Sequence, residues 1–156
     1  MNTNIGEAFH FGMVVHDVAS AMTDLGASLQ LTFAPVEHRV IVLRYRDEVI
    51  TTPLSFTYSR QGPVHLELIG AVPGTPWEEP NQMHHVGYWV EDLSRSVAEL
   101  TSGGMAVEVT YDDPSGDPVG FAYMSGPAGH RIELVEARRR EVMEDWISGD
   151  QAFPAV

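Results

Sequence analysis

The chain has 156 residues, a length that fits one ordinary domain or two closely fused half-domains. Apolar residues make up 44% of the sequence and charged residues 20%, a globular composition that can bury a substantial core. The formal net charge of -13 argues against nucleic acid and anionic membranes as partners, and the absence of cysteine excludes disulfides, thiolate metal sites and cysteine nucleophiles. Because the sequence shows neither a signal peptide nor a long apolar span, we expect a cytoplasmic protein.

The periodicity of apolar residues predicts two successive groups of elements. The first group is a strand, a helix that begins after Asp17, and three strands, at residues 9–15, 18–29, 36–45, 54–59 and 64–69. The second group repeats this order, with its helix after Asp92, at residues 86–90, 93–102, 107–111, 120–125 and 130–135. Proline and glycine mark residues 72–82 as a linker. We expect the tail, residues 138–156, to be polar and at most partly helical, with Arg138 to Arg140 in solvent.

The two groups are related in sequence as well as in order. A shift of 75 residues places His10 to Leu25 over His85 to Leu100, and a shift of 66 places Val64 to Ala71 over His130 to Ala137. Two matches in the same order, at opposite ends of each half, predict a duplicated β-α-β-β-β unit. We therefore expect an α+β fold in which module 8–71 and module 83–137 form one domain, 1–156. The paired modules would build a cup-shaped, barrel-like mixed sheet with the helices outside.

Strand alternation converts this repeat into a candidate metal site. In the first strand His10 lies on the face opposite to Phe9, and we expect a helix to cover the Phe9 face. Four strands each present a His or Glu near the middle of their more polar face, namely His10, Glu67, His85 and Glu133. If the modules pair about a pseudo-twofold axis, these side chains converge, and two imidazoles with two carboxylates suit one divalent ion. The ion could be nickel, zinc, cobalt, manganese or ferrous iron, and the pattern does not choose among them. Without a cation the two facing carboxylates would repel each other.

Several other residues are candidates for contacts with a ligand. Aromatic side chains on strands more often belong to the core, but Trp77 and several others could line a pocket. As candidate substrate contacts we take Phe56, Tyr58, Trp89, Phe121, Tyr123 and Arg131. His65 shares a strand face with Glu67 and is a candidate proton carrier. We expect His16, His38 and His84 to be structural histidines.

Four motifs, covering residues 8–137, resemble the vicinal oxygen chelate superfamily, which includes glyoxalase I, methylmalonyl-CoA epimerase, extradiol dioxygenases, and bleomycin and fosfomycin resistance proteins. They are FHFGMVV with His10, HLELI with Glu67, MHHVGYWVEDL with His85, and GPAGHRIELVE with Glu133. The resemblance implies paired βαβββ modules whose four named residues bind a divalent metal.

The sequence combines features of two branches of this superfamily. The order His, Glu, His, Glu is similar to that of bacterial glyoxalase I, whose first helix carries an aromatic pair that VASAMTDLGASLQL lacks. The second-module motif HHVGYWVEDL is closer to the epimerases, which usually have Gln in place of Glu67 and a catalytic glutamate on the third strand of the first module. The stretch Leu54 to Arg60 contains no acid, and Glu48 precedes it.

The chemistry common to both branches is removal of the proton next to a metal-bound carbonyl. In a lyase or isomerase of this type, His10 and His85 would be fixed ligands, and Glu67 or Glu133 would also act as the base. The substrate would be a small carbonyl compound or a thioester. Two alternatives remain open: a ferrous ring-cleaving dioxygenase in which Glu67 is not a ligand, and a non-catalytic protein that binds an antibiotic-like molecule. Such modules often dimerise, so a homodimer is a candidate assembly.

Overall fold

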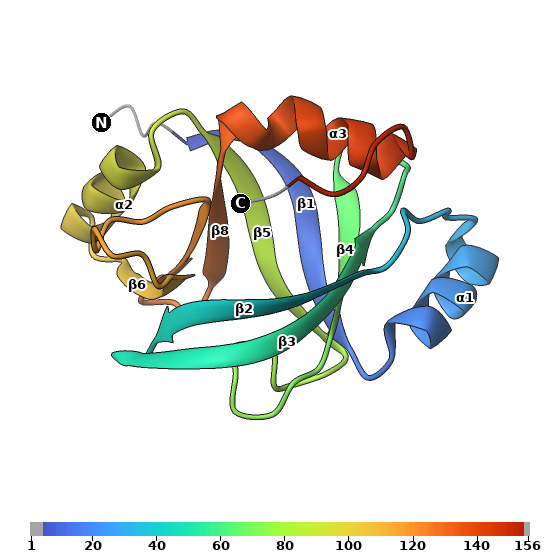
Figure 1. Ribbon diagram of the computed structural model, residues 1–156, viewed down its shortest axis with the longest axis horizontal. Helices are drawn as coiled ribbons and strands as arrows, with labels where there is room; N and C mark the ends of the chain where they lie inside the picture. The colour runs from blue at the N-terminus through green and yellow to red at the C-terminus, as the bar shows by residue number, and fades with distance from the viewer. Residues whose placement is uncertain (1–4, 155–156) are drawn as a thin grey trace.

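The computed structural model describes residues 5–154, and its elements follow the predicted duplication (Figure 1). The first module consists of β1 (Ile5–Val15), α1 (Val18–Leu29), β2 (Glu37–Tyr45), β3 (Glu48–Tyr58) and β4 (His65–Gly70). The second consists of β5 (Gln82–Val90), α2 (Leu93–Ser102), β6 (Ala106–Tyr111), β7 (Phe121–Ser125) and β8 (Arg131–Glu136). A 3₁₀ turn, η1 (Ala137–Arg139), and a helix, α3 (Arg140–Ser148), follow β8.

The eight strands close into one barrel in the order β1-β4-β3-β2-β6-β7-β8-β5. Within each module the first strand is parallel to the last, β1 to β4 and β5 to β8. The modules join through two antiparallel pairs, β1 with β5 and β2 with β6. This arrangement confirms the predicted mixed, barrel-like sheet, and α1 and α2 lie outside the barrel on opposite sides (Figure 1). No helix within residues 5–154 is long and apolar enough to cross a membrane.

Both outer helices begin at the aspartates that the sequence indicated. The Asp17 carboxylate accepts a hydrogen bond from the backbone N–H of Ser20 at 2.7 Å, and Asp92 accepts one from Arg95 at 2.9 Å. These N-caps satisfy amide groups that have no partner within the helix. Apolar residues on each helix then pack on the outer face of its own module, α1 through Val18 and α2 through Leu93 and Val97.

The third strand of the first module is longer than predicted. β3 begins at Glu48, which is exposed, and pairs with β2 along the whole length of β2. Arg46 and Asp47, both with positive φ (51° and 63°), form the two-residue turn of this hairpin. Such a turn matches the twist of the flanking strands and extends their pairing to the tip. The longer middle strands therefore account for part of the extra length of the first module.

The C-terminal tail is partly helical, as predicted, but its helix has a buried apolar face that the sequence analysis did not expect. α3 lies along one end of the barrel (Figure 1) and buries Met143, Trp146 and Ile147. The Trp146 ring packs edge-on against Tyr58, with ring centroids 5.7 Å apart, so the helix belongs to the central core. The apolar spacing i, i+3, i+4 on this short helix supplies one buried face. The other residues of α3 are mostly polar, and for this reason the sequence predicted a polar tail.

Candidate metal centre and cavity

Four side chains from four strands meet inside the barrel. The Nε2 atoms of His10 and His85 lie 2.8 Å apart. One carboxylate oxygen of Glu67 lies 3.4 Å from His10 Nε2 and 3.1 Å from His85 Nε2, and one of Glu133 lies 2.9 Å and 3.2 Å from the same two atoms. The four ligand atoms all lie within 4.8 Å of one another. The structure thus brings together the whole quartet that strand alternation placed on inner faces.

Two glycines make this convergence sterically feasible. In the β1–β5 ladder His10 pairs with Gly87, and Gly12 pairs with His85. A Cβ atom at Gly87 would lie 1.9 Å from Cε1 of His10, and one at Gly12 would lie 2.1 Å from Cε1 of His85. Each imidazole therefore occupies the space above the glycine of the opposite strand. The motif His-x-Gly occurs once in each module. Its histidine is a candidate ligand, and its glycine leaves space for the histidine of the other module.

Electrostatics at the centre favour charged carboxylates and protonated histidines in the metal-free protein. Burial by itself lowers the pKa of His10, but Glu133 and Glu67 outweigh it and raise that pKa to about 9. The pKa of His85 is raised by the same two carboxylates against the opposing effect of burial. Burial raises the pKa of Glu67 and of Glu133, yet the two histidines lower both below their ordinary value. The carboxylates thus remain ionised, as ligands of a cation must be.

The donor set also fits a divalent ion by its geometry. The Oε2 atoms of Glu67 and Glu133 are buried and lack an aligned hydrogen-bond donor among the described residues, although both Nε2 atoms lie within 3.4 Å. Buried carboxylate oxygens rarely lack partners. Four potential ligand atoms that lie within 4.8 Å of one another can surround one ion, and two nitrogens with two oxygens suit the borderline divalent metals.

His84 contacts the Nδ1 atom of His85 and so orients the imidazole of that residue. Its Nδ1 lies 2.9 Å from Nδ1 of His85, and its Nε2 lies 2.7 Å from the carbonyl oxygen of Pro76. Only an N–H can donate to a carbonyl, so His84 carries its proton on Nε2 and accepts on Nδ1 the proton of His85. His85 Nε2 is then left free to act as a ligand. Burial, followed by the charges of His85 and Arg131, lowers the pKa of His84 to about 4, which keeps its ring neutral.

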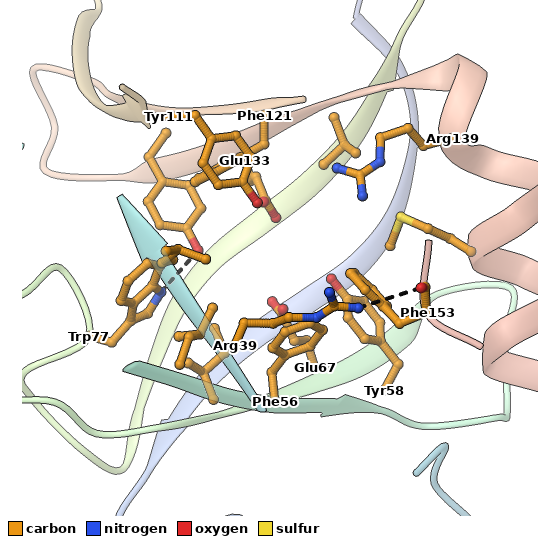
Figure 2. Close-up of a pocket in the computed structure, with 16 residues that line it drawn as sticks. Arg39, Phe56, Tyr58, Glu67, Trp77, Tyr111, Phe121, Glu133, Arg139 and Phe153 are labelled. Atoms are coloured by element: carbon orange, nitrogen blue, oxygen red, sulfur yellow. Dashed lines mark hydrogen bonds between the residues drawn. The ribbon is translucent and has the colours of Figure 1, made fainter. Parts of the chain in front are cut away.

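A cavity opens above the quartet and is walled mainly by apolar and aromatic side chains (Figure 2). Tyr58 stands opposite Glu67 in the β3–β4 ladder, and Tyr123 stands opposite Glu133 in the β7–β8 ladder. Burial, followed by the nearby carboxylates, raises the pKa of both phenols well above its usual value. Tyr123 accepts a hydrogen bond from the indole N–H of Trp77 at 3.0 Å, so its own O–H proton is available to a ligand. The pseudo-twofold symmetry therefore includes two protonated tyrosines.

Of the candidate substrate contacts, four line this cavity and two do not. The four are Phe56, Tyr58, Phe121 and Tyr123, and Trp77 joins them. Trp89 instead stacks on Phe9, with ring centroids 3.8 Å apart, at the end of the barrel beside α3. Phe9 is buried there and not under an outer helix, because bulges in the β1–β5 ladder on both sides of Ala8 break the alternation.

Arg131 and His65 also lie away from the cavity. Arg131 donates to both carboxylate oxygens of Glu108, at 2.7 and 2.6 Å, and faces a separate depression beside His84. His65 forms a 2.7 Å hydrogen bond with the backbone carbonyl of Ser59 and lines another depression, beneath α3. These partners give both side chains structural contacts, and neither one reaches the space that Glu67 and Glu133 face.

The sequence analysis assigned no role in the site to three residues of this region, namely Arg39, His84 and Arg139. Arg39 and Arg139 line the cavity, so the expectation of a solvated arginine run is wrong for Arg139. The side chain of Arg138, by contrast, is 69% exposed. Alternation along β2, whose inner positions include Leu43 and Arg39, could have revealed Arg39. The positions of Arg139 and His84 depend on tertiary contacts that no local sequence pattern predicts.

Comparison with known proteins identifies relatives at the level of fold. The chain is similar to methylmalonyl-CoA epimerase from Mycobacterium tuberculosis, with a TM-score of 0.60, 13% identity, and coverage of 92% of this chain and 95% of that one. It is also similar to a variant of Streptomyces coelicolor methylmalonyl-CoA epimerase bound to 2-nitronate-propionyl-CoA, with a TM-score of 0.57, 17% identity, and coverage of 85% and 97%.

A variant of 4-hydroxymandelate synthase from Streptomyces coelicolor is similar with a TM-score of 0.56 and 20% identity, over 85% of this chain and 39% of that one. No curated protein matches the sequence significantly. A family model, that of the Glyoxalase/Bleomycin resistance protein/Dioxygenase superfamily, matches residues 9–123. Because this match spans well over half of the sequence, the chain belongs to that superfamily.

Proposed function

We propose that this protein is a metal-dependent lyase or isomerase that removes a proton next to the carbonyl group of a small molecule. The observation that carries the proposal is the convergence of His10, His85, Glu67 and Glu133 on one point at the base of a largely apolar cavity. A divalent ion held there would supply a Lewis acid that polarises the carbonyl and favours loss of the neighbouring proton.

The residues of the chain would perform the remaining tasks. Glu67 and Glu133 both line the cavity, and either carboxylate can accept a proton from a molecule bound there. Tyr58 and Tyr123, kept protonated by burial, can donate hydrogen bonds to an oxygen on which negative charge develops. The apolar walls exclude water and strengthen these interactions.

The number of converging groups favours this chemistry over the ferrous dioxygenase alternative. A typical oxygen-activating iron site uses two histidines and one carboxylate and leaves the other positions open. Here the oxygens of both glutamates lie within 3.4 Å of the histidine nitrogens, so four protein groups are in place. The similarity to epimerases supports the proposal only through the common fold.

Metal content is the first test. We expect about one equivalent of a divalent metal in the purified protein, and a large loss in each of the variants His10→Ala, Glu67→Ala, His85→Ala and Glu133→Ala. His38→Ala is a matched control, because His38 is exposed and contacts Ser55 outside the cavity. If only three of the four variants lose metal and the metal is iron, the dioxygenase alternative is favoured, and oxygen consumption with a catechol would establish it.

Proton exchange is the second test. The metal-loaded protein should catalyse deuterium uptake from heavy water at the position next to the carbonyl in some 2-oxo compounds or acyl thioesters, and Glu67→Gln or Glu133→Gln should reduce the rate at least about 100-fold. A metal-loaded, folded protein that exchanges none of the candidates would contradict the proposal and favour a non-catalytic binding role.

A further inference from the structure

Two arginines, one from the first module and one from the C-terminal tail, reach into the same cavity. Arg39 comes from β2 and Arg139 from η1, and Figure 2 shows their guanidinium groups entering the cavity from opposite sides. The Nε atom of each is buried and has no hydrogen-bond partner in the part of the chain that the structure describes. A buried guanidinium N–H without an acceptor is costly, so two of them in one cavity indicate a ligand that supplies acceptors.

The contacts that these arginines do make are weak. Arg39 Nη2 donates to the carbonyl oxygen of Phe153 at 3.5 Å and lies 3.3 Å from a carboxylate oxygen of Glu37. Arg139 Nη2 donates to the carbonyl oxygen of Pro154 at 3.4 Å, and within residues 5–154 no acidic group lies within 4.0 Å of the Arg139 guanidinium. Hydrogen bonds of this length are near the limit of the interaction. Among the described residues, Arg139 thus has no carboxylate partner, and Arg39 has only its contact with Glu37.

The two positive charges also act on the same group. Burial raises the pKa of the Tyr111 phenol, and the charge of Glu133 adds to this rise, whereas the charges of Arg139 and Arg39 act to lower the pKa. Tyr111 lines the cavity, so both guanidiniums lie close enough to one cavity-lining oxygen to influence it. Like charges that share a site repel unless an anion lies between or beside them.

We propose that Arg39 and Arg139 bind a carboxylate group of the substrate, so that the enzyme acts on anionic carbonyl compounds. The guanidinium edge formed by Nε and Nη matches the two oxygens of a carboxylate and forms charge-assisted hydrogen bonds with it. A protein with a formal charge of -13 otherwise repels anions, so a local pair of cations is needed to admit one. This inference rests on the proposed function, because it assigns a substrate class to the same cavity.

The rest of the cavity defines the body of that substrate. Phe56, Phe121, Ile69 and Val135 form apolar walls between the arginines and the metal centre. About 100 Å³ of the cavity is open to the centres of water molecules. A compact molecule fits, for example one aromatic ring that carries a carbonyl group at one end and a carboxylate at the other.

A matched pair of probes tests the charge preference. 4-Acetylbenzoate and its neutral amide, 4-acetylbenzamide, have almost the same shape. Their binding can be measured by calorimetry or through tryptophan fluorescence, because Trp77 lines the cavity. The wild-type protein should bind the carboxylate at least tenfold more tightly than the amide. In Arg39→Gln and Arg139→Gln the preference should fall below twofold, and Arg139→Lys should restore only part of it.

Two controls distinguish a local effect from a change in net charge. Arg44→Gln and Arg138→Gln remove the same charge on the outer surface and should retain the preference; Arg44 lies on the same strand as Arg39, and Arg138 directly precedes Arg139. Metal content is measured for every variant and should stay within twofold of wild type. Equal affinity for the two probes in the wild-type protein, or loss of preference in the outer variants alone, would overturn the inference. Because binding is measured in the protein as purified, the preference can persist even if proton exchange is absent.

Discussion

The glycines opposite the metal ligands provide the sharpest test of the site. Substitution of Gly87 by Ala adds one methyl group, whose carbon would lie 1.9 Å from Cε1 of His10, 2.2 Å from Nδ1 and 2.6 Å from Nε2. Contact between carbon atoms requires about 3.5 Å, so the imidazole must retreat by about 1.6 Å. Metal–ligand distances tolerate only about 0.2 Å. His10 therefore cannot remain a ligand unless the backbone of β1 or β5 moves.

The expected loss follows from this displacement. Mutations that only disturb the partners of a ligand weaken metal affinity about 10- to 100-fold, so displacement of a ligand itself should cost at least about 100-fold. This corresponds to about 2.8 kcal/mol of binding free energy. Overpacking should also lower the free energy of unfolding of the metal-free protein by about 1–3 kcal/mol. Gly12→Ala should behave in the same way through His85, because its Cβ atom would lie 2.1 Å from Cε1 of that ring.

Competition with a chromophoric chelator measures the metal affinity, and chemical denaturation measures stability. Gly126→Ala is a matched control: its Cβ atom would lie 2.0 Å from Cε1 of His130, but His130 is exposed and can rotate into solvent. We expect this control to bind metal as the wild type does. If Gly87→Ala also retained wild-type affinity, with its fold intact, the assignment of His10 as a ligand would be refuted.

Three further predictions concern the surroundings of the centre. His84→Ala should weaken metal binding about 10- to 100-fold with little change in the melting temperature of the metal-free protein, and equal affinity in a chelator competition would contradict the orienting role of His84. The pKa of His10 is raised from 6.5 to about 9, so protonation stabilises the metal-free fold fully below pH 6.5, and this contribution is lost as the pH rises to about 9. The melting temperature of the metal-free protein should therefore fall across that window, and metal affinity should rise by about tenfold per pH unit for each proton displaced. A flat profile in both would show that Glu67 and Glu133 do not raise the pKa of His10. Trp146→Ala should destabilise the protein by about 3–5 kcal/mol in urea denaturation because the ring is 1% exposed in the core, whereas Arg138→Gln should have little effect.

The duplicated fold could be predicted from the sequence because its evidence is local and occurs twice. Offsets of 75 and 66 residues relate the two modules, and aspartates mark the start of both outer helices. Strand alternation predicted that His10, Glu67, His85 and Glu133 face inward, since side chains on a strand point to alternate sides. The structure shows these residues together, and the pairing of His10 with Gly87 explains how they fit.

Alternation failed where the strands are irregular. The bulges around Ala8 place Phe9 in the core beside Trp89, at the α3 end of the barrel, so Phe9 does not lie where a regular strand would put it. Trp89 keeps the inner face that alternation predicts, but it lies at the α3 end and does not line the cavity. A bulge changes the register by one residue, and the composition of the strand does not reveal where it occurs. Similarly, Arg131 has the inward orientation that alternation predicts, but its pairing with Glu108 fixes it away from the cavity.

By itself, the sequence determined the number of modules, the order of their elements and the identity of four inward-facing polar side chains, because each depends on periodicity within a few residues or on a repeat. Only the tertiary structure decided that α3 closes one end of the barrel, that His84 supports His85, and that Arg39 of the first module and Arg139 of the C-terminal tail enter one cavity. These contacts join residues far apart in the chain. These contacts form only when the closed barrel brings its strands and the C-terminal helix together, and no local sequence pattern predicts which distant residues will meet.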